Sequence, residues 1–167
     1  GKSTLARALQ GHFREMGQNP VLLDGDQVRQ VIADPHTGHD HERRLRNAFR
    51  ISRLAHLLAQ QHFLVIVATM SLYHEIHKWN RENTADFFEV LLKADLAILR
   101  QRDAKGLYQQ FDQGKQRNIP GFDLPVEWPL RPELILANEG EISPEAQAAK
   151  IYAAWMARHQ AKNAELD

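Results

Sequence analysis

The chain begins with Gly1-Lys2-Ser3-Thr4 and runs directly into an amphipathic helix, and no other feature constrains the fold as strongly. These residues match the last third of the phosphate-binding pattern G-x-x-x-x-G-K-[ST]. In that pattern, N–H groups at a helix start bind phosphate, Lys2 reaches the β- and γ-phosphates, and the Ser3 hydroxyl binds Mg²⁺. The pattern also needs a strand before Gly1. We therefore expect the sequence to be a trimmed copy of a longer chain, with the first, central strand of its sheet absent.

Short apolar runs alternate with helical patterns along the rest of the chain. The patterns predict strands at residues 21–23, 63–68, 87–94 and 133–138, and helices at 3–16, 28–33, 42–61, 73–82, 95–102, 105–114 and from 144 onward. This alternation predicts an α/β fold, a three-layer sandwich with a mainly parallel sheet. We expect one domain over residues 1–167. A mobile loop is predicted at residues 115–132, which contain four prolines and one glycine.

The composition excludes several classes of protein. The chain has no cysteine, so it cannot form a disulfide, a thiolate metal site or a cysteine nucleophile. Lys+Arg and Asp+Glu both number 21, and the longest apolar run, Phe63 to Ala68, is too short to span a bilayer. Neither nucleic acid nor a membrane is therefore expected as a partner. We expect a cytoplasmic enzyme with small-molecule nucleotide substrates, and leave open whether it forms a homodimer.

The segment LLDGDQVR places two acids directly after a buried strand. The carboxyl ends of strands are where open α/β sheets bind ligands, so Asp24 and Asp26 are candidates for chemistry. An acid there can orient Mg²⁺ through water or accept the proton of an attacking hydroxyl. Arg29 would offer a planar fork to a phosphate or sulfate. A D-G surface turn is the alternative, but the strand at 63–68 ends without an acid, so Asp24 is the better candidate.

Three other groups of residues have competing interpretations. His36, His39 and His41 could form a metal tract, but no acid or cysteine pattern completes it, so a polar substrate loop is favoured. Five arginines between residues 43 and 53 could form a nucleic-acid surface, but on a helix they span more than one face. Trp79 and Trp128 are interpreted as packing residues rather than as platforms for a base.

Four segments, in the order LLDGDQVR, RLRNAFRISRLAHLL, RDAKGLY and NIPGFDLPVEWP, resemble the adenylylsulfate kinase family. The resemblance extends from residue 1 to about residue 138. It implies a P-loop kinase fold and an enzyme that uses Mg²⁺ and transfers the γ-phosphoryl group of ATP to the 3′-hydroxyl of adenylylsulfate. It also implies that residues 117–129 belong to a lid, which we place at about 115–132.

The motifs and the resemblance together predict the site residues. The catalytic set is Asp24, Lys2 and Ser71, and Mg²⁺ would be held by Ser3 and Asp24, partly through water. The predicted ATP-binding residues are Gly1, Lys2, Ser3, Thr4 and Arg102, with Arg102 near the base. The predicted acceptor-binding residues are Asp26, Arg29, His39, Arg44, Asn47, Met70, Lys105 and Ile119.

The chain departs from the family pattern at the acceptor base. The family places a phenylalanine at the positions of His39 and Ile119, and these two rings sandwich the adenine of adenylylsulfate. The family's I-S-P segment reads Met70-Ser71-Leu72 here, and the arginine that often follows is His74. Loss of both rings should weaken adenine binding unless other side chains compensate.

The departures leave several functions open. The chain could act on another nucleotide, such as cytidine diphosphoramidate in capsule biosynthesis, since a kinase of that type resembles the same family. It could instead be a nucleotide-binding switch without transferase activity, or an interaction protein with an inactive loop. The K-G-L-Y segment and the acceptor set favour a kinase, because a switch needs no second nucleotide site.

Overall fold

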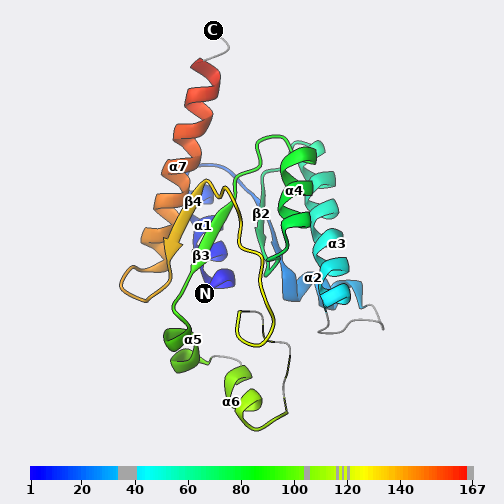
Figure 1. Ribbon diagram of the computed structural model, residues 1–167. Coiled ribbons are helices and arrows are strands. Elements are labelled where there is room, and N and C mark those ends of the chain that lie inside the picture. Colours follow the sequence, from blue (N-terminus) through cyan, green and yellow to red (C-terminus); the bar gives the residue numbers. More distant parts are fainter. Residues whose placement is uncertain (34–40, 104–105, 116, 118, 120, 165–167) are drawn as a thin grey trace.

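The structure is a computed structural model that describes residues 1–33, 41–103, 106–115, 117, 119 and 121–164, as drawn in Figure 1. The elements follow one another in the order α1 (Lys2–Glu15), β1 (Val21–Asp24), α2 (Gly25–Ile32), α3 (His41–Gln60), β2 (Val65–Ala68), α4 (His74–Asn83), β3 (Val90–Lys93), α5 (Leu96–Arg102), α6 (Leu107–Asp112), β4 (Leu134–Ala137) and α7 (Pro144–Ala164). No helix in the described ranges has the length and apolar character needed to cross a membrane.

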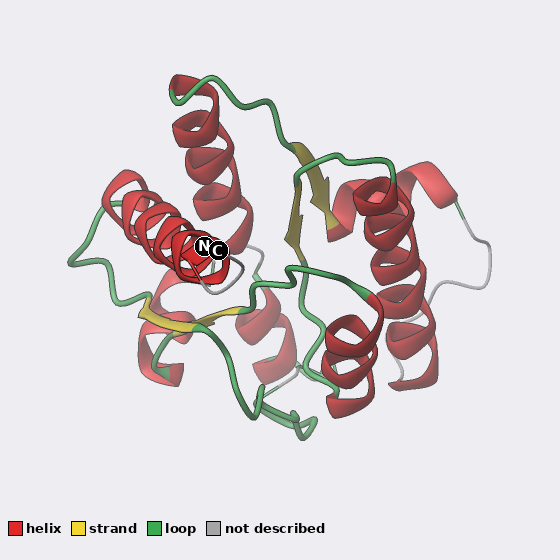
Figure 2. Ribbon diagram, turned by 90° about the horizontal axis from the view of Figure 1, so that it is seen from above, coloured by secondary structure: helices red, strands yellow, loops and turns green. Residues whose placement is uncertain are grey.

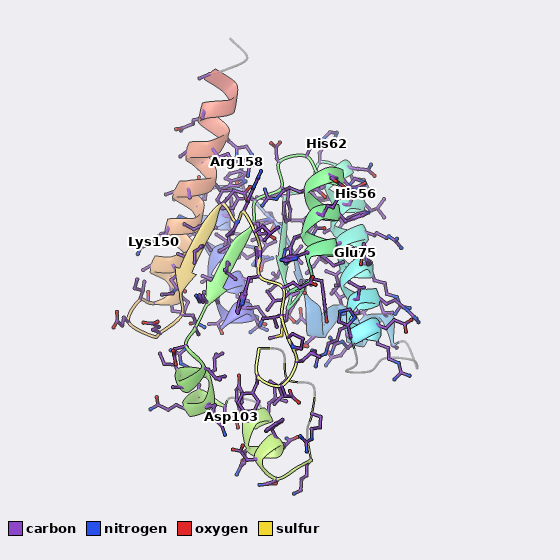
Figure 3. The ribbon with its side chains drawn as sticks, in the orientation of Figure 1. His56, His62, Glu75, Asp103, Lys150 and Arg158 are labelled. Atoms are coloured by element: carbon purple, nitrogen blue, oxygen red, sulfur yellow. The ribbon has the colours of Figure 1, made fainter. Side chains whose placement is uncertain are left out.

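The strands form two parallel pairs. β1 pairs with β2, with Asp24 opposite Ala68 at the end, and β3 pairs with β4, with Lys93 opposite Ala137. The predicted parallel pairing is therefore confirmed, although β2 and β3 share no ladder within the described part of the chain. The strands end toward α5 and α6 (Figure 1), and Asp103 after α5 lies at the opposite end of the molecule from Arg158 of α7 (Figure 3).

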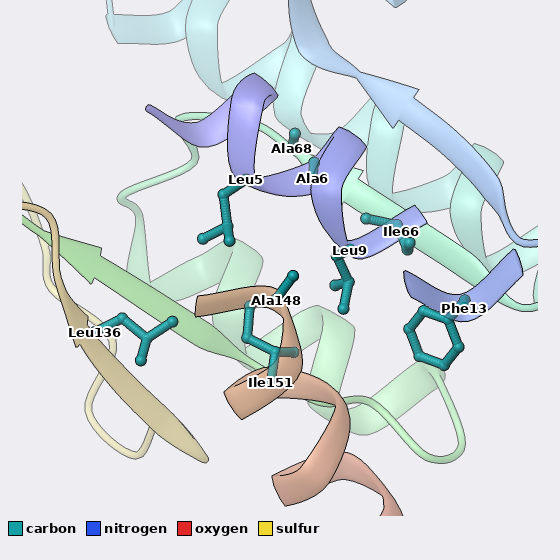
Figure 4. Packing of buried hydrophobic residues seen from close by; sticks show 9 residues of the cluster. All are labelled: Leu5, Ala6, Leu9, Phe13, Ile66, Ala68, Leu136, Ala148 and Ile151. Carbon is teal, nitrogen blue, oxygen red and sulfur yellow. The ribbon is translucent and has the colours of Figure 1, made fainter. Parts of the chain in front are cut away.

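Helices α1 and α7 cover one face of both strand pairs. The apolar stripe of α1 packs against α7, β2 and β4 in a cluster of nine buried residues, shown in Figure 4: Leu5, Ala6, Leu9, Phe13, Ile66, Ala68, Leu136, Ala148 and Ile151. Helix α1 has this stripe because its apolar residues recur every three or four positions. The cluster packs against both strand pairs, which share no ladder among the residues that the structure describes.

Helices α2, α3 and α4 lie on the other side of β1 and β2 (Figure 2). Leu23 of β1 packs with Val28 and Ile51, which belong to α2 and α3. Leu22, the neighbouring strand residue, packs in the cluster on the opposite face, as the alternation of side chains along a strand requires. The predicted three-layer α/β sandwich is thus confirmed.

Two predicted helix starts differ from the observed ones for local reasons. Helix α2 begins at Gly25 rather than at residue 28, because the Asp24 carboxylate accepts hydrogen bonds from the first-turn N–H groups. Gly25 also lies close to Thr69, since a Cβ at position 25 would sit 3.3 Å from the Thr69 Cβ. Helix α6 begins at Leu107, after Gly106 in the left-handed region with φ of 64°.

Two of the three tryptophans are packing residues. The Trp79 ring lies 6.3 Å from the ring of Phe49, and the Trp155 ring lies 5.2 Å from that of Phe13. The packing interpretation of Trp79 is therefore confirmed. Trp128 is 45% exposed and has no ring contact with any described residue, so it is not part of a core.

An ionic network ties α4 and α7 to the starts of β3 and β4. Glu89 accepts from Arg81 at 3.0 Å and pairs with His77, while Glu133 accepts from Arg81 at 2.7 Å and lies 3.0 Å from Arg158. The backbone N–H of Glu89 also donates to the Glu133 carboxylate at 2.8 Å. The strand predicted at 87–94 is shorter in the structure, where β3 begins at Val90. The Glu89 carbonyl still accepts from the N–H of Leu134, whereas its N–H bonds to the Glu133 side chain.

The network lowers the pKa of both of its carboxylates. Burial alone would raise the pKa of Glu89, but the hydrogen bonds and charges of His77 and Arg81 outweigh burial and hold it below 4.5. Burial would likewise raise the pKa of Glu133, but hydrogen bonds from Arg81 and from the N–H of Glu89 lower it. A carboxylate whose pKa is lower in the folded state than in the unfolded state stabilises the fold at pH values above its unfolded pKa. This stabilisation is lost as the pH falls through the lowered, folded-state pKa.

This linkage predicts how Glu89 affects acid unfolding. The Glu89→Gln variant should lose about 1–2 kcal/mol of unfolding free energy at neutral pH, because a charge-assisted hydrogen bond becomes a neutral one. The loss should shrink as the pH falls through the lowered pKa of Glu89, because the wild-type carboxylate is then protonated as well. Urea titrations at several pH values measure this, with exposed Glu82→Gln as the control. A difference that stays constant down to the lowest pH would contradict the assignment.

Candidate active site

Asp24 lies at the carboxyl end of β1 and is only 6% exposed. One of its oxygens, Oδ1, accepts from the backbone N–H groups of Asp26 at 3.0 Å and Gln27 at 3.4 Å. The carboxylate thereby caps α2 and has a fixed orientation. The sequence pattern placed this acid correctly at the strand end, and Asp26 follows it as an exposed residue in the first turn of α2.

Asp24 also contacts the start of α1. Burial alone would raise the pKa of Asp24, but a hydrogen bond with the Ser3 side chain, the N–H groups of Asp26 and Gln27, and the charge of Arg7 together lower it. The carboxylate therefore stays ionised at neutral pH. Sequence reasoning did not single out Arg7. Its position one helical turn after Ser3 could have indicated that the two side chains lie on the same face of the helix.

The first turn of α1 presents the residues predicted to bind phosphate. Lys2 and Thr4 are exposed, and Ser3 is half-buried beside Asp24. The helix ladder starts at Gly1, whose carbonyl accepts from the N–H of Leu5 at 2.9 Å. The N–H groups of such a first turn point out of the helix start, which is the arrangement that binds phosphate.

The segment after β2 lies beside Asp24, because Asp24 is paired in register with Ala68. The hydroxyls of Thr69 and Ser71 are hydrogen-bonded at 2.5 Å, so Thr69 holds the side chain of Ser71. Met70 between them is 47% exposed. The structure thus brings the predicted Ser71 and Met70 to the same sheet end as Asp24.

Arg102 reaches the start of α1 through Asn138. Its guanidinium donates to the Asn138 carbonyl at 2.8 Å and lies 3.4 Å from the side-chain oxygen of the same residue. The Asn138 amide in turn lies against Gly1, where an added Cβ would sit 2.4 Å from Nδ2. Sequence reasoning missed Asn138, although its position at the end of the strand predicted at 133–138 was a usable signal.

Arg44 and Asn47 lie on the side of α3 that packs inward, and both are half-buried. Arg44 shares its helix face with Ala48, which packs against Tyr73, two residues after Ser71. Arg29 is half-buried in α2. These three residues therefore come from helices that flank the end of β1 and the segment after β2.

Three further residues were predicted to bind the acceptor. His39 and Lys105 lie outside the described residues. Ile119, predicted to contact the acceptor, is only 5% exposed. Its N–H donates to the Asp123 carboxylate, and its carbonyl accepts from the N–H of Asp123. A side chain this buried presents little surface to a base, and contact of Ile119 with the acceptor stays a prediction.

The ring of Phe122, which lies in the predicted lid, packs against α6. Phe122 lies 4.7 Å from the ring of Phe111 and 5.8 Å from that of Tyr108, with the Arg100 guanidinium 5.1 Å from its centre. Arg100 also pairs with Asp112 at 2.7 Å, which ties α5 to α6. The ring of Phe122 thus serves packing beside α6.

The donor chemistry at Ser3 and Asp24 fits Mg²⁺. A hydroxyl and an ionised carboxylate are hard oxygen ligands, which this ion prefers, and Mg²⁺ is usually held by one or two carboxylates together with water and substrate phosphates. Over the described ranges, no cluster of three or more His, Cys, Asp or Glu side chains could hold a metal by itself.

In P-loop nucleotide kinases, a helix whose first turn holds G-K-[ST] faces an acid on a neighbouring strand. The hydrogen bond between Ser3 and Asp24 places this chain in that class. The chain belongs to the adenylylsulphate kinase family, whose sequence model matches residues 1–137. The predicted P-loop kinase fold and the family resemblance are confirmed by this match and by the solved structures.

Relatives with different acceptors in their names resemble the chain. The probable adenylyl-sulfate kinase of Bacillus subtilis is 38% identical over 148 residues, which are 87% of this chain and 74% of that protein. The cytidine diphosphoramidate kinase of Campylobacter jejuni is 31% identical over 138 residues, which are 83% and 79% of the two chains. The structure of the Mycobacterium tuberculosis APS kinase in complex with AMPPNP and APS matches with a TM-score of 0.83 at 32% identity, covering 92% of this chain and 90% of that one.

Proposed function

We propose that this protein transfers the γ-phosphoryl group of ATP to the 3′-hydroxyl of adenylylsulfate, which gives 3′-phosphoadenylylsulfate for sulfate assimilation. The contact between Ser3 and Asp24 carries the proposal, because it joins the phosphate-binding helix start to the acid that would orient the acceptor hydroxyl. Family membership supports the choice of adenylylsulfate, which the names of several relatives also give.

The proposed roles follow from the placement of the side chains. ATP lies on the first turn of α1, with Lys2 near the transferred phosphoryl group and Arg102 near the base. Asp24 accepts a hydrogen bond from the acceptor hydroxyl and fixes its direction of attack. Its lowered pKa makes it a weak base, which suits phosphoryl transfer, since positioning and charge stabilisation supply most of the catalysis.

Other residues would hold the acceptor. Arg29, Arg44 and Asn47 offer donors to its anionic tail, and guanidinium groups bind sulfate and phosphate with two parallel hydrogen bonds. Lys105 would add a further charge, and Ser71 would lie near the acceptor ribose. We propose that residues 115–132 act as a lid that excludes water from the phosphoryl group.

Mg²⁺ would be held by Ser3 and, directly or through water, by Asp24. When bound with ATP, the ion neutralises charge on the β- and γ-phosphates. The ionised state of Asp24 is what this chain contributes to such binding. We also propose that the whole of residues 1–167 works as one kinase domain in the cytoplasm.

A second candidate is transfer to another nucleotide, such as cytidine diphosphoramidate. Two observations favour it. Ile119 stands where the family has a ring that stacks on adenine, and its side chain is buried. A relative named cytidine diphosphoramidate kinase is 31% identical to this chain. A pyrimidine is smaller than adenine and depends less on two stacked rings. Both candidate functions use the same ATP-binding residues and differ only in the acceptor nucleotide.

A coupled assay of ATP consumption separates the two candidates. The intact protein is supplied with MgATP and either adenylylsulfate or a panel of cytidine and uridine diphosphate conjugates. We expect the highest kcat/KM with adenylylsulfate. A clear preference for a cytidine conjugate would favour the second candidate. Hydrolysis of GTP without transfer to any nucleotide would refute both and favour a switch.

A further inference from the structure

A backbone segment far along the chain is tied to the start of α4. The N–H of Glu127 donates to the carbonyl of Leu72 at 3.1 Å. The Glu127 carboxylate accepts from the backbone N–H of His74 at 2.5 Å, and the His74 ring nitrogen Nε2 lies 2.9 Å from the Trp128 carbonyl. Three hydrogen bonds thus connect residues more than fifty positions apart in the sequence.

The chemistry of these contacts fixes the role of His74. A carbonyl oxygen only accepts, so Nε2 carries the proton and donates to Trp128. The other ring nitrogen, Nδ1, lies 3.9 Å from the Glu127 carboxylate. His74 therefore holds Glu127 through its backbone and Trp128 through its side chain.

These three hydrogen bonds, which we call the tie, lie next to the proposed acceptor site. Leu72 directly follows Ser71, whose hydroxyl is bonded to Thr69, and Tyr73 is buried. The tied residues Glu127 and Trp128 belong to the described part of the proposed lid. A shift at His74 would therefore move the segment that carries Ser71 relative to the lid.

We propose that His74 is a positioning residue that fixes the lid against the acceptor segment. This inference rests on the proposed function, because only a kinase with a second nucleotide site needs the two segments in register. His74 does not touch the reacting atoms. Its ring acts by holding Trp128, so loss of the ring should weaken acceptor binding and leave the ATP side intact.

The test compares His74→Ala, His74→Gln and Lys78→Ala with the wild type. Glutamine can restore the donor because its side-chain amide nitrogen reaches about as far as Nε2. Lys78 lies in the same helix and is exposed, with a weak 3.9 Å contact to Glu82, so it controls for changes in α4. The measurements are the KM for each substrate, kcat, and the rate of tryptic cleavage between residues 115 and 131.

For His74→Ala we expect the acceptor KM to rise about three- to tenfold, the factor that one hydrogen bond supplies, with the KM for ATP unchanged. Tryptic cleavage should become faster by a similar factor. His74→Gln should recover most of both losses, and Lys78→Ala should match the wild type. A general loss of stability would not produce this split between the two KM values.

Three results would overturn the inference: no change in His74→Ala, no recovery in His74→Gln, or the same change in Lys78→Ala. Proteolysis needs no catalysis, so it tests the tie even if the wild type phosphorylates neither nucleotide. In that case the proposed function fails on the wild type alone, and the tie is judged on cleavage rates. The two failures are therefore distinguishable.

Discussion

Replacing Asp24 with asparagine should lower kcat for phosphoryl transfer by about 10³-fold, within the range for loss of a positioned acid or base. The asparagine side-chain oxygen can still accept from the first-turn N–H groups of α2, so the helix keeps its cap. It lacks the negative charge that, in the proposed mechanism, orients the acceptor hydroxyl and supports Mg²⁺. The dissociation constant for ATP should change by less than about threefold, since Lys2 and the helix start remain.

Single-turnover transfer and equilibrium titration with an ATP analogue measure the two effects separately. Asp95→Asn is the matched control, because Asp95 caps α5 by accepting from the N–H of Ala97 at 2.7 Å. That variant shares the change from Asp to Asn at a helix cap but lies outside the proposed site. Turnover by Asp24→Asn close to that of Asp95→Asn would refute the role given to Asp24.

The largest effect on stability is expected at Glu133. Replacing it with alanine removes the acceptor for Arg81, Arg158 and the backbone N–H of Glu89 in a single step. Loss of one partner from a buried ion pair costs about 3–5 kcal/mol. The two arginines are 35% and 31% exposed, so water compensates in part and we expect about 2–3 kcal/mol.

Urea unfolding of the intact protein measures this loss, which should also lower Tm by about 4–12 °C. Glu133→Gln should lose less, because its side-chain oxygen still accepts from Arg81. Glu82→Ala serves as the control, since Glu82 is exposed and 3.9 Å from Lys78, and should change the unfolding free energy by less than about 0.5 kcal/mol. Equal losses at positions 133 and 82 would show that the network adds no stability.

The sequence predicted the features that depend on neighbouring residues. The period of apolar residues predicted α1 and α3 to within a residue or two at each end. The strand that ends in Asp24 was visible because a buried run followed by two acids is a local pattern. Ser143 directly precedes α7, and its hydroxyl accepts from the N–H of Ala146 at 3.1 Å, as a serine at a helix start commonly does.

The features that were not predicted depend on residues distant in the sequence. No local pattern connects Arg81 with Glu133, or His74 with Trp128, because such pairs are set by how the layers pack. The contact of Asn138 with Gly1 depends on the ends of α1 and β4 meeting at one edge. The helix predicted from residue 28 begins three residues earlier, at Gly25, because hydrogen bonds to the Asp24 side chain favour a helix there rather than the alternative D-G turn.

The Asp24 carboxylate caps α2 and is also proposed to orient the acceptor hydroxyl, and this double use would affect the energetic cost of the reaction. Two amide groups of α2 and the Ser3 side chain already hold this carboxylate in one direction. Its dipolar surroundings are therefore aligned before any nucleotide arrives, and little reorganisation remains when charge shifts in the transition state. A more loosely held acid at this end of the strand would have to be oriented in each turnover, which would raise the barrier.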